Sequence, residues 1–173
     1  MTQTMPTAWI AMGANLGDRA ATLGSALKAL KALPGVSRVE ASPLYETAPV
    51  GGPHQPPFLN ACVRLDLNAG EPKILLSSLL SIEAGLGRRR EGGVRWGPRV
   101  LDLDLLLFDD RMLSMEGLTL PHPRFHERAF VLRPLADLDP SLRHPGLGRT
   151  VSEMLSGVDQ AGVFPWQDGT WPN

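Results

Sequence analysis

Short apolar runs that end at glycine or proline alternate along this chain with leucines at helical spacing. Residues 7–13 form such a run, which predicts a buried strand. Leucines then recur every three or four positions over residues 23–33, and Asp18 is a suitable N-cap for the helix that this spacing predicts. The Pro-Gly pair at residues 34–35 should end that helix.

The middle of the chain predicts two more strands and a second helix. Residues 36–47 predict a strand broken near Pro43, whereas four prolines and two glycines exclude regular structure from residues 49–57. Every second residue is apolar over much of residues 58–68, so we expect a third strand with one buried face. Residues 71–87 combine a leucine stripe with a proline in the first turn, which predicts a helix.

The last part of the chain predicts one long strand followed by smaller elements. Residues 100–108, with the sequence VLDLDLLLF, predict a central strand, and residues 112–120 predict a small hairpin. Helical patterns follow over residues 129–138 and, more briefly, over residues 151–158. The tail of residues 159–173 is rich in glycine, proline and tryptophan, and its pattern determines little.

The order of these elements is strand, helix, strand, strand, helix, strand, followed by additions. This βαββαβ order predicts a ferredoxin-like α+β fold, in which the helices pack on one face of an antiparallel sheet. Because neither a repeat nor a linker interrupts the pattern, we expect residues 1–173 to form a single domain.

Composition narrows the class of protein without identifying it. A hydrophobic content of 43%, a charged content of 20% and a net charge of −1 are typical of a soluble globular protein with no general attraction for nucleic acid. The single cysteine, Cys62, is expected to be a buried thiol, since it has no partner for an internal disulfide. No signal peptide or membrane-spanning run is evident, which predicts a cytoplasmic protein.

Two aspartates interrupt the apolar run of residues 100–108. Residues two apart on a strand share a face, so Asp102 and Asp104 should point the same way. The opposite face is then expected to hold Leu101, Leu103, Leu105 and Leu107. Two neighbouring carboxylates repel each other, which arginines, protonation or Mg²⁺ would relieve. An edge strand with solvated aspartates is the simpler alternative.

A basic segment precedes this strand. Its five arginines within twelve residues are Arg88, Arg89, Arg90, Arg95 and Arg99. Arginine binds phosphate oxygens through a planar, bidentate fork, so the segment is suited to a polyphosphate. It could equally be a solvated loop, or a nucleic-acid site with Trp96 as the stacking residue. The chain lacks the GxxxxGK[ST] phosphate loop, and the glycines of GANLGD predict a strand-to-helix turn.

The segment RWGPRVLDLDLL resembles the signature of the 6-hydroxymethyl-7,8-dihydropterin pyrophosphokinase family. Further blocks resemble that family in the same order, namely AMGANLGDR, SPLYETAPVGG, FLNACV, IEAGLGRRR and LPHPRFHERAFVLRPL. The resemblance covers most of residues 8–136 and implies a ferredoxin-like fold. It also implies transfer of the pyrophosphoryl group of ATP to the pterin, with release of AMP, in folate biosynthesis. Two Mg²⁺ ions, a cytoplasmic location and a monomer with small-molecule substrates are expected.

The same resemblance assigns residues to the metal and the nucleotide. Asp102 and Asp104 are implied as ligands of both magnesium ions. The residues implied to bind ATP are Glu83, Arg88, Arg90, Arg99, His122 and Arg128. Of these, Arg88 and Arg99 are expected to share the catalytic role with the two aspartates. Taken singly, Glu83 could be a solvated helix residue and His122 a surface histidine.

The pterin site is assigned in the same way. The implied residues are Thr47, Ala48, Val50, Phe58, Asn60, Trp96, Asp102 and Phe130. Phe58 and Phe130 would sandwich the flat ring, and Asn60 would bind its edge through an amide donor and acceptor. Taken singly, the two phenylalanines could be core aromatics. Ala48 stands where proline is common in the family, so the loop loses rigidity, and Phe58 stands where some relatives have tyrosine, so its ring lacks a hydroxyl.

Two rival functions remain compatible with the residues alone. One is a ferredoxin-like nucleotidyl or phosphoryl transferase, which would release pyrophosphate or ADP in place of AMP. The other is an RNA-binding module without enzymatic activity, which would show steep salt dependence and no need for Mg²⁺.

Overall fold

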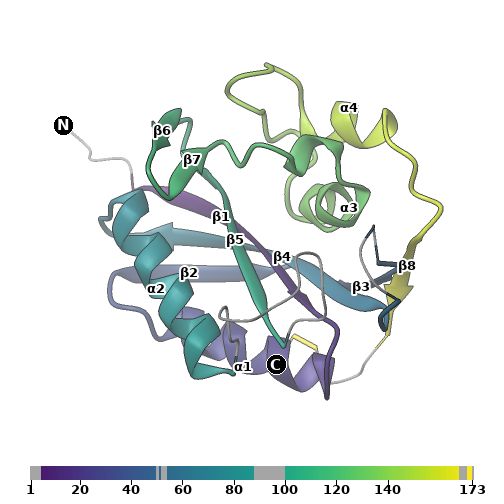
Figure 1. Cartoon of the computed structure of the whole chain (residues 1–173). Helices are drawn as coiled ribbons and strands as arrows, with labels where there is room; N and C mark the ends of the chain where they lie inside the picture. Colours follow the sequence, from purple (N-terminus) through teal and green to yellow (C-terminus); the bar gives the residue numbers. More distant parts are fainter. Residues whose placement is uncertain (1–4, 50, 52–53, 88–99, 168–170, 173) are drawn as a thin grey trace.

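The molecule is built around a six-stranded antiparallel sheet. We describe it from a computed structural model, in which residues 5–49, 51, 54–87, 100–167 and 171–172 are described. The strand order is β5-β1-β4-β3-β8, and β2 pairs with β4 beside β3 (Figure 1). These strands are β1 (Thr7–Ala14), β2 (Val36–Ala41), β3 (Leu44–Thr47), β4 (Phe58–Leu67), β5 (Asp102–Phe108) and β8 (Val163–Trp166).

Two helices cover one face of this sheet, as the strand and helix order predicts. They are α1 (Arg19–Lys31) and α2 (Pro72–Gly85), and Leu23, Leu27 and Leu79 are among the side chains that they bury. The Asp18 carboxylate accepts a hydrogen bond from the Ala21 amide at 3.1 Å, so the expected N-cap of α1 is confirmed.

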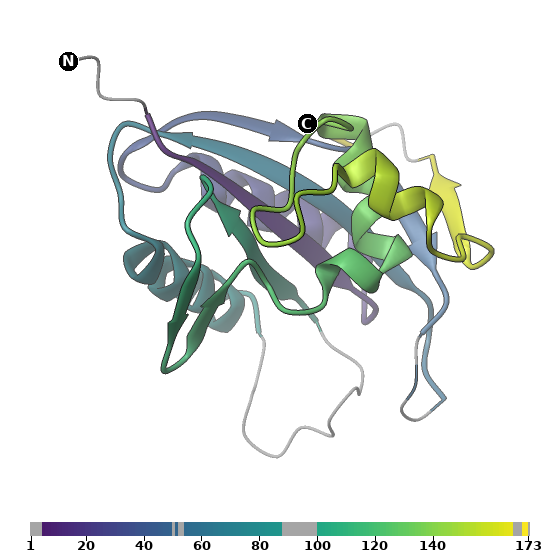
Figure 2. The same cartoon turned by 90° about the horizontal axis from the view of Figure 1, so that it is seen from above.

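The elements after β5 divide between the two faces of the sheet. The hairpin of β6 (Leu113–Met115) and β7 (Leu118–Leu120) packs into the apolar cluster beneath α1 and α2, whereas the 3₁₀ turn η1 (Phe125–Glu127) and helices α3 (Ala129–Leu138) and α4 (Val151–Ser156) cover the opposite face. A second apolar cluster, which includes Trp9, Cys62 and Leu132, lies between this layer and the sheet. Figures 1 and 2 show α3 and α4 side by side, away from α2. The two helices of the predicted core therefore share one face, and the helices of the C-terminal additions cover the other.

Strand β5 differs from its prediction in three ways. It begins at Asp102, two residues later than expected, and it pairs only with β1 among the described residues, so it is a terminal strand and not a central one. Its pairing also shifts register, because Ile10 pairs with Leu105 but Trp9 pairs with Leu107. This bulge turns Leu107 onto the face of Trp9, away from the leucines with which it was grouped.

The tail contributes a strand that the pattern did not predict. β8 pairs antiparallel with β3, from Thr47 opposite Val163 to Leu44 opposite Trp166. No helix within the described residues combines the length and the apolar character that crossing a membrane requires.

Candidate active site

The two aspartates lie on the sheet face that α3 covers. Asp102 pairs with Gly13 of β1, and Asp104 pairs with Ala11. Both carboxylates are half-buried, while Leu103 between them points into the core on the opposite face. The predicted shared face of the two aspartates is therefore confirmed.

Asn60 occupies the same row of the sheet as Asp102. It pairs with Gly13 from the other side, so one strand separates the amide from the carboxylate, a span of roughly 10 Å. Asn60 is buried, and its Nδ2 donates to the Thr47 hydroxyl at 2.5 Å. This bond orients the Asn60 side chain and leaves its Oδ1 as an acceptor.

Gly13 makes this row possible, and the sequence-based interpretation missed it. A Cβ at this position would lie 3.0 Å from Asn60 Oδ1 and 3.8 Å from Phe58 Cδ1, so a larger residue would displace the amide. Gly13 was predicted as the end of the first strand and as part of the turn that follows, and it lies within β1, but no role in the site was assigned to it. A glycine inside an apolar strand was the available signal, since it often marks a close approach to a side chain or ligand.

His122 lies at the edge of β5, where its backbone N–H donates to the Leu106 carbonyl at 2.8 Å. Burial, with a smaller contribution from the charge of Arg128, lowers the pKa of His122 to about 4. Its Nδ1 accepts the Arg124 amide at 3.2 Å, so the neutral ring carries its proton on Nε2. The imidazole is thus a neutral hydrogen-bond donor near Asp102 and Arg128, not a solvated surface histidine.

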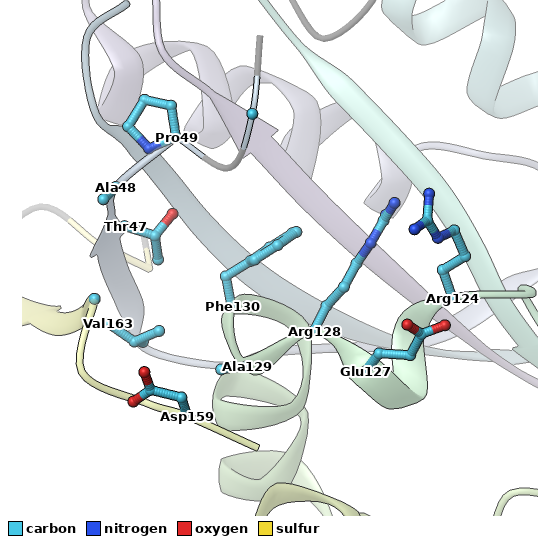
Figure 3. Close-up of a pocket in the computed structure, with 12 residues that line it drawn as sticks. Thr47, Ala48, Pro49, Arg124, Glu127, Arg128, Ala129, Phe130, Asp159 and Val163 are labelled. Carbon is cyan, nitrogen blue, oxygen red and sulfur yellow. The ribbon is translucent and has the colours of Figure 1, made fainter.

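A pocket of about 520 Å³ lies between the end of β3 and the start of α3 (Figure 3). Four of the predicted site residues line it, namely Thr47, Ala48, Arg128 and Phe130. The guanidinium of Arg128 lies 5.7 Å from the centre of the Phe130 ring, and Figure 3 shows both side chains rising side by side from the start of α3. The pocket is therefore lined by an aromatic ring with a positive charge beside it.

Other residues of this pocket were not predicted. Arg124 and Glu127 come from the turn before α3, while Asp159 and Val163 come from the tail. Asp159 is held by its own turn, since its Oδ1 accepts the Ala161 amide at 2.9 Å. Neither spacing nor composition marked these tail residues, because the pairing of β8 with β3 brings them to the pocket.

The remaining predicted residues differ in their placement. Glu83 is 1% exposed and faces the sheet from α2, so the alternative of a solvated helix residue is wrong. Phe58 is half-buried beside Gly13 and does not line the pocket. The predicted residues that lie outside the described part of the chain are Val50, Arg88, Arg90, Trp96 and Arg99.

The donors gathered here suit a metal-bound polyphosphate beside a planar ring. Asp102 and Asp104 give carboxylate oxygens from one rigid strand, and Mg²⁺ commonly uses one or two carboxylates together with substrate phosphates. Within the described residues, no cluster of three or more His, Cys, Asp or Glu side chains is suited to hold a metal ion alone. The two aspartates therefore fit a metal whose remaining ligands come from phosphate and water.

Comparison with known sequences gives one consistent result. The sequence model of the 7,8-dihydro-6-hydroxymethylpterin-pyrophosphokinase family matches residues 9–140. The chain is 46% identical over 159 residues to a 2-amino-4-hydroxy-6-hydroxymethyldihydropteridine pyrophosphokinase of Methylorubrum extorquens, which covers 92% of this chain and 98% of that one. A protein of the same name from Pseudomonas aeruginosa is 43% identical, covering 90% of this chain and 93% of its own.

Solved structures agree on the fold. A crystal structure of Plasmodium falciparum HPPK-DHPS superposes with a TM-score of 0.70 at 15% identity over 88% of this chain. The match spans 43% of that solved chain, so this chain corresponds to less than half of it. The neighbouring domains have a ferredoxin-like fold, which confirms the predicted α+β class.

Proposed function

This chain belongs to the 7,8-dihydro-6-hydroxymethylpterin pyrophosphokinase family, and we propose from that membership how its residues carry out the family's reaction. The enzyme is a diphosphotransferase of folate biosynthesis, with ATP as co-substrate and hydroxymethyldihydropterin as acceptor. The pterin hydroxymethyl oxygen attacks the β-phosphorus of ATP, AMP leaves, and the pterin diphosphate is the product.

In this proposal, Asp102 and Asp104 hold two Mg²⁺ ions. Both carboxylates are half-buried on one face of a regular strand, which fixes their separation better than a loop would. When bound, the ions would supply positive charge at the phosphate oxygens. Asp102, one of the two residues that would hold the ions, pairs with Gly13, which pairs on its other side with Asn60.

The phosphates of ATP are assigned to the cationic side of the site. Arg128 provides a guanidinium at the pocket, and the neutral His122 donates through Nε2–H. The family resemblance assigns phosphate contacts to Arg88 and Arg99, with Arg90 approaching them. The same resemblance assigns Glu83 to the border of the nucleotide site.

The pterin is assigned to the other side. Phe58 and Phe130 hold the ring by stacking, and Asn60 binds its edge. Thr47 supports Asn60 through the 2.5 Å hydrogen bond and presents its own backbone groups. The family resemblance also assigns Ala48 and Val50 to the pterin site, and it assigns to Trp96 a part in closing the site with the basic loop.

The proposed acceleration comes from positioning and charge stabilisation. Binding both substrates on one sheet face converts an encounter of two molecules into a reaction within one complex. Fixed cations and hydrogen-bond donors then stabilise the charge that develops on the transferred group. Asp102 and Asn60 both pair with Gly13, so Asp102 could accept the hydroxymethyl proton; alternatively, a metal that lowers the pKa of that hydroxyl would make a separate base unnecessary.

The observation that carries this proposal is the row across β5, β1 and β4. It joins a carboxylate suited to a metal, a glycine that leaves space, and an amide suited to a heterocycle edge, namely Asp102, Gly13 and Asn60. Such a row brings a phosphate-binding end and a ring-binding end to one face.

Product analysis tests the proposal. Purified protein is mixed with ATP, 6-hydroxymethyl-7,8-dihydropterin and Mg²⁺, and the nucleotides are separated. We expect pterin-dependent AMP in a one-to-one ratio with the pterin diphosphate, and loss of turnover when EDTA removes the metal. ADP or pyrophosphate as product would favour the rival transferase, and RNA binding without nucleotide turnover would favour the binding module.

The proposal also covers the cellular location, the oligomeric state and the partners of the enzyme. We place it in the cytoplasm as a monomer, with residues 1–173 forming one catalytic domain that acts on small molecules and not on nucleic acid or membranes. Size-exclusion chromatography with light scattering checks the monomer.

A further inference from the structure

Arg19, the first residue of α1, joins three separate segments of the chain. Its Nη1 donates to the Pro57 carbonyl at 2.8 Å, and its Nη2 donates to Glu46 Oε2 at 2.9 Å. The guanidinium carbon also lies 5.1 Å from the centre of the Trp166 ring, which belongs to β8. One side chain therefore binds the end of β3, the start of β4 and the C-terminal strand.

Each hydrogen-bonded segment continues directly into a proposed pterin residue. Glu46 precedes Thr47 in β3, and Pro57 precedes Phe58 in β4. Arg19 itself does not line the pocket, because α1 lies against the opposite face of the sheet. It can influence the pterin only through the positions of the residues that it holds.

Asn15, in the turn between β1 and α1, reinforces the same segment. Its Nδ2 donates to Gln55 Oε1 at 2.9 Å and to the Pro56 carbonyl at 3.1 Å. Asn15 is 2% exposed and Gln55 is 7% exposed, so these bonds are shielded from water. Donors from this turn and from the first residue of α1 thus hold residues 55–57 immediately before Phe58.

The contacts of Arg19 restrict the conformations available to the chain before Phe58. The Arg19 side chain is 19% exposed and that of Glu46 is 34% exposed, so the ion pair is partly shielded. Charge-assisted bonds from a guanidinium are stronger than neutral ones, and the planar fork fixes the direction of both. Without them, the chain before Phe58 would lose a restraint, and binding a ligand would cost the entropy of ordering it.

We infer that Arg19 is a positioning residue for the pterin, which holds Thr47 and Phe58 in their binding arrangement from behind the sheet. The inference rests on the proposed function. It concerns binding of the pterin and not of ATP, since both bonded segments lead to pterin residues.

The test compares steady-state kinetics of Arg19→Gln with those of the wild type. We expect KM for the pterin to rise by about tenfold, because one ion pair and one charge-assisted bond to the chain before Phe58 are lost. We expect kcat and KM for ATP to stay within about twofold, since no group that touches the phosphates is changed. Arg19→Lys, which can keep one of the two bonds, should give an intermediate KM for the pterin.

Arg111→Gln is the matched control. Arg111 also pairs with a carboxylate, Glu71 Oε2 at 2.8 Å, and its guanidinium carbon also lies 5.3 Å from an aromatic ring, that of Phe108. It lies at the other end of β5 from Asp102. We therefore expect a comparable loss of surface contacts without any change in KM for the pterin.

The outcomes separate the inference from the proposed function. If the wild type releases AMP but Arg19→Gln and Arg111→Gln have the same KM for the pterin, the inference alone is overturned. Equal losses in kcat and in both KM values for Arg19→Gln would overturn it too, because they indicate general loss of structure. A wild type that releases no AMP would overturn the proposed function and the inference with it.

Discussion

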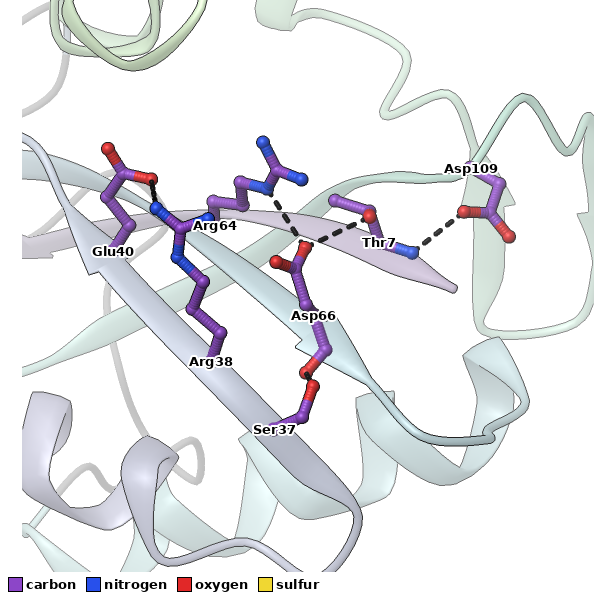
Figure 4. Close-up of polar contacts among 7 residues, drawn as sticks. All are labelled: Thr7, Ser37, Arg38, Glu40, Arg64, Asp66 and Asp109. Atoms are coloured by element: carbon purple, nitrogen blue, oxygen red, sulfur yellow. Dashed lines mark hydrogen bonds and ion pairs between the residues drawn. The ribbon is translucent and has the colours of Figure 1, made fainter. Parts of the chain in front are cut away.

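At the residue scale, carboxylates on one sheet face serve different purposes. Asp66, at the far end of β4, accepts bonds from Arg64 Nε at 2.9 Å and from the Thr7 hydroxyl at 3.1 Å (Figure 4). Its charge is balanced within the fold, so its role is structural. Asp102 and Asp104 lie near the other end of the sheet, where Asp102 pairs with Gly13 and lies close to His122.

Asp102→Asn tests the metal role of this pair. The change keeps the shape of the side chain but removes a negative charge, so kcat should fall by roughly two or more orders of magnitude. Circular dichroism should show an unchanged fold. Asp110→Asn, at an exposed position just after β5, is the control and should retain wild-type kcat. Near-normal turnover of Asp102→Asn would contradict the assignment.

Gly13→Ala tests the space beneath the amide of Asn60. The new Cβ would lie 3.0 Å from Asn60 Oδ1, so the amide must shift and KM for the pterin should rise by about tenfold. Gly24→Ala is the control, because no atom lies within 4 Å of its Cβ and alanine favours the helix by about 1 kcal/mol. If Gly13→Ala and Gly24→Ala have the same KM for the pterin, the close approach at Gly13 has no role in recognition.

At the element scale, the contact of β3 with α3 determines the shape of the pocket. β3 brings Thr47 to one wall, and the start of α3 brings Arg128 and Phe130 to the other. The Tyr45 hydroxyl donates to the Asp137 carboxylate, which Arg133 also contacts, and so links the two elements. The pocket therefore depends on an interaction outside its own lining.

Tyr45→Phe should weaken this link. Losing a hydrogen bond to a charged group should lower the free energy of unfolding at neutral pH by about 1–2 kcal/mol, measured by urea denaturation. Because the bond leaves the strands themselves intact, circular dichroism of the folded variant should match that of the wild type. An unchanged denaturation midpoint would contradict the proposed link between β3 and α3.

The pH dependence of this link has a definite sign. Burial, followed by the hydrogen bond to Asp137, raises the pKa of Tyr45 above its ordinary value of 10.0. A raised folded-state pKa means that the stabilisation is complete below pH 10.0 and is lost as the pH rises through the folded-state pKa. Tyr45 is the only tyrosine in the sequence, so ultraviolet titration of the folded protein reports it directly, and a pKa at or below 10.0 would contradict this expectation.

At the scale of the whole molecule, two apolar layers enclose the sheet. One lies beneath α1 and α2, and the other lies between the sheet and α3 with α4. Cys62 is fully buried in the second layer, where its Sγ lies 3.5 Å from the Val131 carbonyl. Its exposure requires α3 to separate from the sheet, so its reactivity measures the opening of the layer that carries Phe130.

Cys62 should accordingly resist alkylation in the folded protein. Burial, with a smaller contribution from Asp137, raises the pKa of the Cys62 thiol, so the reactive thiolate is suppressed. We expect iodoacetamide to modify the folded chain orders of magnitude more slowly than the urea-unfolded chain, as measured by mass spectrometry. Similar rates in the two states would show that the second layer opens freely.

Local pattern was sufficient for most of the secondary structure and for the identity of the chemistry. The leucine spacing before Pro34, the break near Pro43 and the shared face of Asp102 and Asp104 were all predicted correctly. These features depend on residues only a few positions apart, whose side-chain directions follow from helical or strand geometry. The motif that contains the aspartates then identified the family, and the comparisons confirm it.

Only the tertiary structure decided how these elements meet. The bulge that turns Leu107 over, the terminal place of β5 and the pairing of β8 with β3 all depend on partners distant in the chain. The space beneath Asn60 and the reach of Arg19 likewise arise where segments from different parts of the sequence converge. A sequence pattern records which face a residue prefers, whereas register and contact are set by packing between strands far apart along the chain.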